Sequence, residues 1–192
     1  MGPAETAGTA TPRQRLLRQV VDHVVAHGLG DLSLRELAAA IGTSHRMLLY
    51  HFGSKENLVV EVIRAVEADQ RALFADIAAD PAVAPLDAAR AMWRRFTDPA
   101  VRPHERLFFE VYGQALQGRP GTTELLDGII DSWAEPLADE ATRRGLSPAD
   151  ARAWGRLAVA VTRGLLLDLL ATGDLDAVND AYELFLGTMM AS

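Results

Sequence analysis

The sequence predicts an all-α protein, and three observations carry that prediction. Apolar residues recur at helical spacing along nearly the whole chain, and the alternation typical of strands is almost absent. The breaks between apolar segments carry residues that begin and end helices. A hydrophobic content of 49% over 192 residues is enough for a buried core. We expect about nine helices, forming an N-terminal three-helix domain with a helix-turn-helix and a larger C-terminal helical domain.

The first helix is expected to begin after residue 11. Thr11, Pro12 and Gln14 form an N-cap, a first-turn proline and the third residue of a capping box. The helix should end at Gly28 or Gly30, either of which can take the left-handed C-terminal conformation. Its apolar stripe consists of Leu16, Leu17, Val20, Val21, Val24 and Val25.

Two short helices and a long one follow. The first short helix opens with a second capping box, completed by Glu36, and closes at Gly42. The second ends near Phe52, and the long helix runs from Lys55 toward residue 77. The expected N-caps, in chain order, are Ser33, then Thr43 or Ser44, and Ser54.

The remaining helices are separated by proline- and glycine-containing breaks. A helix over 123–144 contains Pro136, which we expect to bend or divide it. Ser147 and Pro148 repeat the cap-plus-proline pattern before another long helix. The expected ranges are 86–97, a helix that follows a turn at 98–103 and ends at 118–121, then 123–144, 148–172 and 175–190.

Composition narrows the protein class and suggests three segments. The chain has no cysteine, which excludes disulfides and thiol chemistry, and we expect neither a metal site nor a cofactor. No apolar run reaches the length of a membrane span and the N-terminus does not resemble a secretory signal, so a cytoplasmic protein is expected. We expect a disordered tail over 1–10, a helix-turn-helix domain over 11–53 and a larger helical domain over 54–192, whose expected roles in effector binding and dimerisation are derived below.

Charge is distributed unevenly between the ends of the chain. Residues 1–55 hold six basic and four acidic side chains, a balance of +2, while the rest hold 13 basic and 22 acidic ones, a balance of −9. A mildly basic N-terminal segment on an otherwise acidic chain is typical of a protein that contacts DNA through that segment alone. Ordinary charge scatter is the alternative interpretation.

The segment 33–55 predicts a DNA-reading surface. Packing of its apolar residues against the first helix would turn the start of the second short helix outward, where Arg46 could bond to guanine and Met47 could touch a thymine methyl group. Arg13 could reach the adjacent DNA backbone. The predicted DNA contacts are Arg35, Thr43, Ser44, His45, Arg46, Met47, Tyr50, His51 and Lys55. The alternative is that these residues are solvated surface, with Tyr50 and His51 a structural pair.

The same segment resembles the DNA-binding domain of the TetR family of repressors. The resemblance rests on three runs, Ser33-Leu34-Arg35-Glu36-Leu37-Ala38, Ile41-Gly42-Thr43-Ser44 and Leu48-Leu49-Tyr50-His51-Phe52-Gly53-Ser54-Lys55-Glu56-Asn57-Leu58. It covers about the first third of the chain. The family usually has tyrosine where this chain has Leu49, so the aromatic phosphate contact would come from Tyr50. Arg46 stands where the family often has a small residue, which suggests an operator of its own.

The resemblance implies a ligand cavity in the C-terminal part. The residues available to line it are Met92, Trp93, Phe96, Phe108, Phe109, Tyr112, Trp133 and Trp154, which predict an apolar or aromatic effector. The alternative is that these side chains only fill the core. His104, Glu110, Tyr112 and Gln114 could orient a ligand or lie at the surface.

The last two helices predict a homodimer interface. Small residues that allow close helix approach are Gly155, Ala158, Ala160 and Gly164. Apolar residues for the same surface are Leu157, Val161, Leu165, Leu166, Leu169, Leu170, Ala181, Leu184, Phe185 and Met189, with Thr188 beside them. Two such helices from each subunit would form a four-helix bundle about a two-fold axis. The alternative is that the first of these helices is the core of its own subunit.

Taken together, these patterns predict a repressor that a small effector releases from a palindromic double-stranded DNA operator. The alternative is a DNA-binding protein of the same fold that is controlled by a protein partner. An enzyme is not expected, because the chain beyond residue 55 holds no nucleophile–base pair, phosphate loop or metal-ligand spacing.

Overall fold

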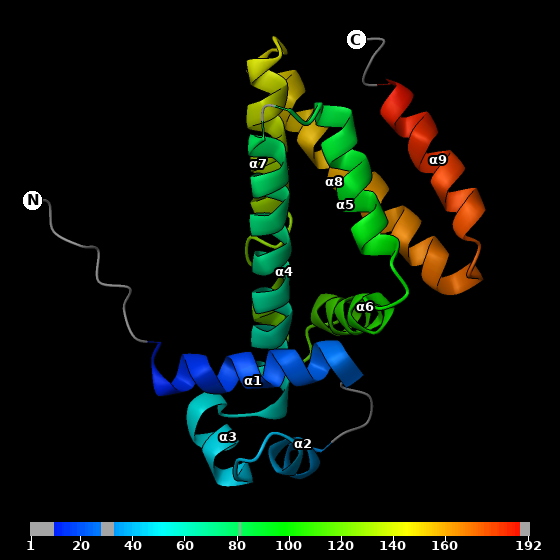
Figure 1. The fold of residues 1–192 in the computed structure, drawn as a ribbon. Coiled ribbons are helices and arrows are strands. Elements are labelled where there is room, and N and C mark those ends of the chain that lie inside the picture. Colours follow the sequence, from blue (N-terminus) through cyan, green and yellow to red (C-terminus); the bar gives the residue numbers. More distant parts are fainter. Residues whose placement is uncertain (1–9, 28–32, 81, 189–192) are drawn as a thin grey trace, which may run out of the picture.

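The computed structural model describes residues 10–27, 33–80 and 82–188, and this part of the chain is helical throughout, without strands (Figure 1). The all-α class and the expected nine α-helices are confirmed there, with one additional short 3-10 helix, η1. The elements are α1 (Pro12–His27), α2 (Leu34–Ala40), α3 (His45–Phe52), α4 (Lys55–Ala79), α5 (Pro85–Thr97), α6 (Arg102–Leu116), η1 (Thr123–Leu126), α7 (Asp131–Arg143), α8 (Pro148–Thr172) and α9 (Leu175–Thr188).

The N-terminal helices begin where their capping residues predict. The amide of Thr11 donates to Gln14 Oε1 at 2.8 Å, and Ser33 and Glu36 form the second capping box. The cap of α3 is Ser44, whose Oγ accepts from the amide of Met47 at 3.2 Å, so the choice between Thr43 and Ser44 is decided. Several expectations lie outside the described residues: tail residues 1–9, the stops at Gly28 and Gly30, and Met189.

One hydrophobic core joins the N-terminal helices to the rest of the molecule. Leu16, Val20, Val21 and Val24 of α1 are buried, but Val25 is 42% exposed and does not belong to the buried stripe. The same core contains residues of α2 and α3, namely Leu34, Leu37, Ala38 and Leu48. It also contains the buried face of α4 from Leu58 to Val66. From α6, η1 and the segment before α7 it contains Phe108, Val111, Ala115, Leu125 and Ile129. We call α1–α3 the head and α4–α9 the body; the domain boundary between residues 53 and 54 remains a prediction.

The continuous helix expected over 123–144 is wrong. The short η1 ends at Leu126 and α7 begins only at Asp131, so the break falls around Gly128, which has a left-handed φ of 68°. Pro136 lies inside α7 without dividing it. The turn expected up to residue 103 is also too long, because α6 begins at Arg102 and accepts Pro103 in its first turn, where no amide hydrogen bond is lost.

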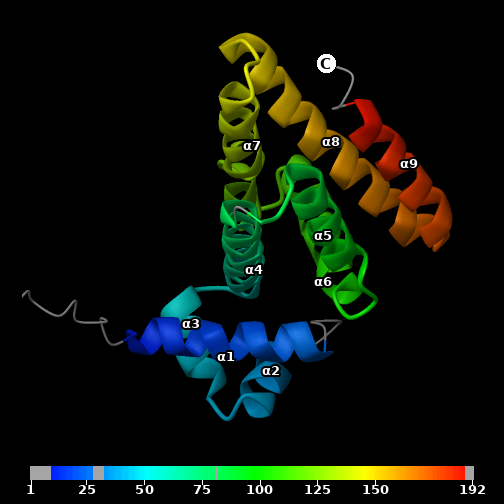
Figure 2. The same ribbon diagram turned by 45° about the horizontal axis from the view of Figure 1, so that its top comes forward.

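The views in Figures 1 and 2 agree on the arrangement of the helices. Helices α1, α2 and α3 lie together at one end of the molecule, and α4 begins there directly after α3. Helix α4 runs from the head into the body, and α9 lies along α8 on the side away from α7. None of the described helices combines the length and the apolar character that a membrane crossing requires.

Candidate DNA-binding surface and ligand cavity

A sharp turn places α3 against α2. Gly42 has φ 72°, a conformation that side-chain-bearing residues rarely adopt, and the amide of Thr43 donates to the Ala38 carbonyl at 2.9 Å. Leu48 and Phe52 bury one side of α3 in the core shared with α1. The opposite side of α3 is therefore directed away from the molecule.

That outward side carries the residues predicted to touch DNA. Arg46 is exposed, Met47 is 41% exposed and Tyr50 is 79% exposed, while His45 and His51 are half-buried. The rings of Tyr50 and His51 meet edge to face with centroids 5.0 Å apart, so the expected structural pairing of these two residues is present as well. An aromatic residue as exposed as Tyr50 contributes little to the core.

Four further predicted contacts surround α3. Arg35 and Ser44 are exposed, and Thr43 and Lys55 are half-buried. Among the described residues, no ion pair within 4.0 Å involves Arg35, Lys55 or Arg46. Within the described part of the chain, no acidic group therefore neutralises their positive charges at close range.

Arg13 takes a different role from the one expected. Its Nε donates to the carbonyl of His51 at 3.2 Å, its guanidinium pairs with Glu61 of α4, and its Cζ lies 5.2 Å from the centroid of the Phe52 ring. Arg13 therefore ties α1 to the end of α3 and to α4, and the contacts found do not leave it free for the DNA backbone.

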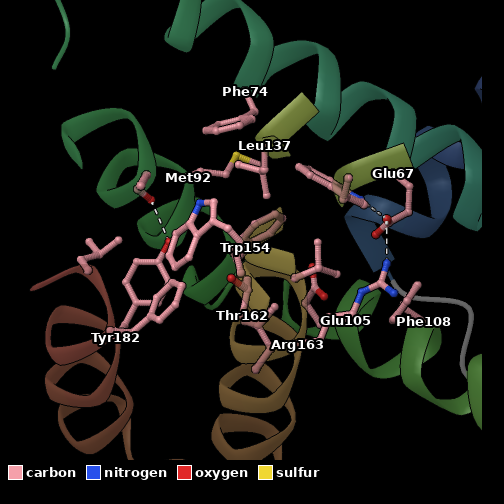
Figure 3. A pocket seen from close by; sticks show the side chains of 18 of the residues that line it. Glu67, Phe74, Met92, Glu105, Phe108, Leu137, Trp154, Thr162, Arg163 and Tyr182 are labelled. Atoms are coloured by element: carbon pink, nitrogen blue, oxygen red, sulfur yellow. Dashed lines mark hydrogen bonds and ion pairs between the residues drawn. The ribbon is translucent and has the colours of Figure 1, made fainter. Parts of the chain in front are cut away.

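The body encloses a cavity of about 110 Å³ to which all six of its α-helices contribute (Figure 3). Six of the eight residues predicted to surround a ligand line it: Met92, Phe96, Phe108, Phe109, Trp133 and Trp154. Phe74, Thr162, Tyr182 and Phe185 complete most of the wall. Sequence reasoning had selected aromatic residues of α5–α8 but not those of α4 and α9.

The other two predicted residues lie behind the wall. Trp93 is buried, donates its indole N–H to Asn179 Oδ1 at 2.8 Å and stacks on Tyr182 with centroids 4.3 Å apart. Tyr112 stacks on Phe108 at 5.5 Å. Trp93 and Tyr112 therefore hold lining side chains in place and do not line the cavity themselves.

The polar residues considered for ligand orientation also lie outside the cavity wall. His104 is buried, neither of its ring nitrogens has a hydrogen-bond partner, and burial lowers its pKa to about 4. Gln114 donates to Glu110 at 3.2 Å near the surface. Neither His104 nor this pair faces a ligand in the cavity.

Three charged residues, all missed by sequence reasoning, do line the cavity: the buried Glu67 and Glu105 and the half-buried Arg163. Glu67 accepts from Trp133 Nε1 at 2.6 Å, and its Oε2 lies 3.7 Å from Arg163 and 3.9 Å from Arg71. Burial raises the pKa of Glu67, an effect opposed by these three partners. The available signal was an arginine inside the most apolar stretch of the sequence, where a charge needs a partner.

Arg163 connects this charge cluster to the break between η1 and α7. It donates to the carbonyl of Ile129 at 3.0 Å, and its Cζ lies 4.8 Å from the centroid of the Phe108 ring. Its other terminal nitrogen, Nη1, is buried without a partner. The guanidinium is thus shared among α4, α6 and the segment before α7.

A wider groove of about 620 Å³ adjoins the cavity. The two spaces share Phe74, Ala89, Trp133, Leu137 and Trp154, so these side chains form the wall between them. The cavity alone is smaller than a drug-sized ligand site of roughly 300–1,000 Å³. A larger ligand would require these shared side chains to move.

Helix α8 has two differently built faces. A Cβ on Gly155 would lie 2.3 Å from the Ala134 carbonyl oxygen, so Gly155 allows α7 to pack closely within the subunit. Ala160 and Gly164 are instead exposed, as are Leu157 of α8 (50%) and Leu184 of α9 (76%). The four small residues expected to serve one interface therefore divide between internal packing and the outer surface.

The described residues contain no group of three acidic or histidine side chains placed to hold a metal ion. Comparison with curated proteins finds no match to the chain. Residues 24–62 match the family model of the bacterial regulatory proteins of the tetR family.

Solved structures resemble the chain over nearly its whole length. A transcriptional regulator from Rhodococcus sp. Rha1 is 21% identical, with a TM-score of 0.69 over 94% of this chain and 97% of that one. A TetR transcriptional regulator from Legionella pneumophila is 15% identical, with a TM-score of 0.66 over 95% and 98%. A protein from Saccharomonospora viridis solved in complex with choline is 20% identical, with a TM-score of 0.60 over 88% and 90%. The chain thus carries the N-terminal domain of the TetR family and, along nearly its whole length, the fold of TetR-family transcriptional regulators.

Proposed function

We propose that the protein is a sequence-specific repressor whose head binds a palindromic DNA operator and whose body releases that operator when a small molecule binds. The observation that carries the proposal is the outward side of α3, where Arg46, Met47 and Tyr50 are exposed at the end of the molecule opposite the body. A helix of this kind places its N-terminal residues against base edges in the major groove.

Within this proposal the nine residues divide into two roles. Arg46 and Met47 contact base edges, and His45 contacts a base or a phosphate. Arg35, Tyr50, His51 and Lys55, with Thr43 and Ser44, contact the DNA backbone. The start of α4, whose Ser54 Oγ accepts from the Asn57 amide at 3.1 Å, adds free amides that suit a phosphate.

The proposed assembly is a homodimer through the outer faces of α8 and α9. Leu157, Leu167 and Leu184 are each at least half exposed there, and Ala160 and Gly164 leave room for a second backbone. A two-fold dimer would present two α3 helices about 34–36 Å apart, one turn of DNA. This distance sets the spacing of the two half-sites, and the two-fold symmetry of the dimer makes the operator a palindrome.

The cavity is the proposed effector site, and two connections link it to the head. Glu67 and Phe74 place α4 in the cavity wall, and the same helix begins directly after α3. The second connection runs through the segment that includes η1 and precedes α7. Arg163 donates to the Ile129 carbonyl, and Arg64 of α4 donates to the Glu124 carbonyl in η1. A ligand that rearranges Arg163 or Glu67 would therefore shift α4 and, with it, the head.

A ligand changes DNA affinity only by its preference for one of two states of the protein. The aromatic wall favours an effector with an apolar or aromatic body, and the likeness to a protein that holds choline supports a small molecule in this fold. Control by a protein partner remains the alternative, favoured if no small molecule changes DNA affinity. No catalytic role is proposed for the cavity.

Selection of bound DNA from a random pool tests the proposal. The wild type should enrich a palindrome, and Arg46→Ala should lose preference at one position in each half-site, by about 1–3 kcal/mol. The matched control is Arg152→Ala, an exposed arginine at the start of α8, which should leave the selected sequence unchanged. Equal weakening on every sequence would assign Arg46 to phosphate, and no enrichment by the wild type would contradict the proposal.

A further inference from the structure

The cavity contains one acidic group that its own surroundings leave without a balancing partner. Glu105, in the first turn of α6, is 5% exposed and lines the cavity, and its Oε1 is buried without a hydrogen-bond partner (Figure 3). Gln70 is the neighbour that hydrogen-bonds to this carboxyl group. A buried carboxylate with a free oxygen is costly unless something binds it.

The other charged residues of the cavity wall have partners, although Nη1 of Arg163 is buried without one. Glu67 has Trp133, Arg163 and Arg71 around it, and Arg163 also holds the Ile129 carbonyl and the face of Phe108. No ion pair within 4.0 Å among the described residues includes Glu105. Glu67 thus shares Arg163 and Arg71, while Glu105 lies in the cavity wall without an ion-pair partner within 4.0 Å among the described residues.

The surroundings of Glu105 suit a cation. Phe108 and Phe109 follow it by three and four residues on the same side of α6, and Phe96 and Trp154 complete an aromatic wall. Aromatic faces attract cations, most strongly where water is excluded. An anion would face both Glu67 and Glu105, and a purely apolar molecule would leave Oε1 of Glu105 unsatisfied.

We propose that the ligand of this cavity is a small organic monocation, a protonated or quaternary amine with an aromatic or apolar body, whose positive charge is held by Glu105. This inference rests on the proposed function, because it takes the cavity to be the effector site. It adds the charge of the effector to the apolar character predicted from the aromatic residues.

The ionisation of Glu105 gives the proposal a second readout. Burial, with the nearby charge of Glu67, raises the pKa of Glu105 to about 8, so near neutral pH the carboxyl group is largely protonated. A cation that binds the ionised form must release that proton. Its affinity should therefore rise with pH and level off above about pH 8.

The other titratable and charged groups near Glu105 are Glu67 and Arg71 of α4, Arg163 of α8, and His104 and Tyr112 of α6. His104 stays neutral in this range because its pKa is about 4. Glu67 shares in the electrostatics of the cavity, so the assignment to Glu105 depends on a variant. Glu105→Gln should abolish both the proton release and the rise of affinity with pH.

The experiment compares two probes of the same shape. Benzyltrimethylammonium and its uncharged carbon analogue neopentylbenzene are titrated into the intact protein, with phenylacetate as the anionic arm, and binding is followed by calorimetry and by tryptophan fluorescence. The wild type should bind the cation at least about tenfold more tightly than the neutral analogue. Glu105→Gln should lose that preference while keeping its affinity for the neutral compound.

Two variants serve as controls for the substitution. Glu110→Gln removes an exposed acid from the same helix and should leave the preference intact. Glu105→Asp keeps the carboxyl group and should retain a preference for the cation. It separates loss of the charge from the effect of substituting any residue at this position. The inference is overturned if the wild type fails to bind the cation, prefers the neutral or anionic probe, or if Glu105→Gln retains the full preference.

Failure of this inference can be told apart from failure of the proposed function by measuring DNA affinity with the same compounds. Selective cation binding that leaves DNA affinity unchanged would support the cation site and contradict the effector role of the cavity. Release of DNA by a neutral compound, with equal binding to wild type and Glu105→Gln, would support the effector role and overturn the cation site.

Discussion

The head and the body are held together by different kinds of interaction. In the head, helices begin with side-chain caps in which the donor and acceptor are three residues apart. The amide of Met47, for example, donates to Ser44 Oγ, and both residues are exposed. In the body, Glu67 and Arg163 meet across the cavity from α4 and α8, and both are largely buried. The head and the body share a hydrophobic core, but the head adds local caps at its surface and the body adds a buried ion pair between distant parts of the chain.

The difference also separates the two proposed functions. A DNA-reading surface must be convex and exposed, so it can be assembled from one short segment. A ligand cavity must be concave and enclosed, so it needs residues from all six helices of the body. Substitution of a surface cap in the head should consequently affect stability less than substitution of a buried charge in the body.

The largest effect is expected for Glu67→Ala. Removing this carboxylate leaves Arg163 buried without its nearest acidic partner, which should lower the free energy of unfolding by about 3–5 kcal/mol. Urea unfolding followed by circular dichroism measures the loss. Glu110→Ala, at an exposed site, should change it by less than about 0.5 kcal/mol. Similar small losses for both variants would contradict a strong buried pair.

Glu105→Gln should raise the free energy of unfolding, and the size of the increase should depend on pH. The raised pKa means that Glu105 contributes most to stability below its ordinary value of 4.5 and loses that contribution as pH rises through about 8. Gln cannot ionise, so the variant should gain on the wild type by up to a few kcal/mol between about pH 5 and pH 8. Thermal unfolding across this range tests it, and parallel curves for the two proteins would show that Glu105 does not titrate as described.

A matched pair of glycines compares the two faces of α8. Gly155→Ala forces a Cβ against the Ala134 carbonyl and should cost about 1–3 kcal/mol by separating α7 from α8. Gly164→Ala meets nothing within 4 Å in the single subunit and should stabilise the helix by up to about 1 kcal/mol. Thermal unfolding of both variants under conditions that keep the subunits apart gives the comparison. A loss for Gly164→Ala as large as that for Gly155→Ala would refute the assignment of the two faces.

The smallest effect is expected in the head. Ser44→Ala removes the cap of α3 and should cost about 1 kcal/mol. Thr43→Ala removes a hydroxyl that does not cap α3 and should stay within about 0.5 kcal/mol. Chemical unfolding distinguishes the two, and equal losses would mean that the cap at Ser44 does not stabilise the helix.

Helix boundaries set by neighbouring residues could be predicted from the sequence, whereas the break before α7 could not. Ser33 and Gly42 in the head, and Ser54 at the start of α4, marked helix boundaries correctly because each acts within a few residues of itself. In the body, Pro136 suggested a break that occurs at Gly128, since a proline can be tolerated in a helix and a left-handed glycine cannot continue one.

The cavity was only partly predictable for a related reason. Aromatic side chains such as Phe96 and Trp133 could be selected by size, but Trp93 and Tyr112 satisfy the same criterion and lie behind the wall. The charged lining residues Glu67 and Glu105 resemble ordinary surface acids in sequence. Their burial is decided by how α4, α6 and α8 pack, which no local pattern specifies.

Photocrosslinking tests the central claim, that α3 is the part of the molecule that reads DNA, most directly. The photoreactive residue p-benzoylphenylalanine is placed at Met47 in one protein and at Arg152 in another, and each is irradiated with the selected operator. We predict crosslinks to major-groove bases from position 47, one set in each half-site, and none from position 152. Crosslinks of equal yield from both positions, or none from position 47 while the DNA is bound, would contradict the account.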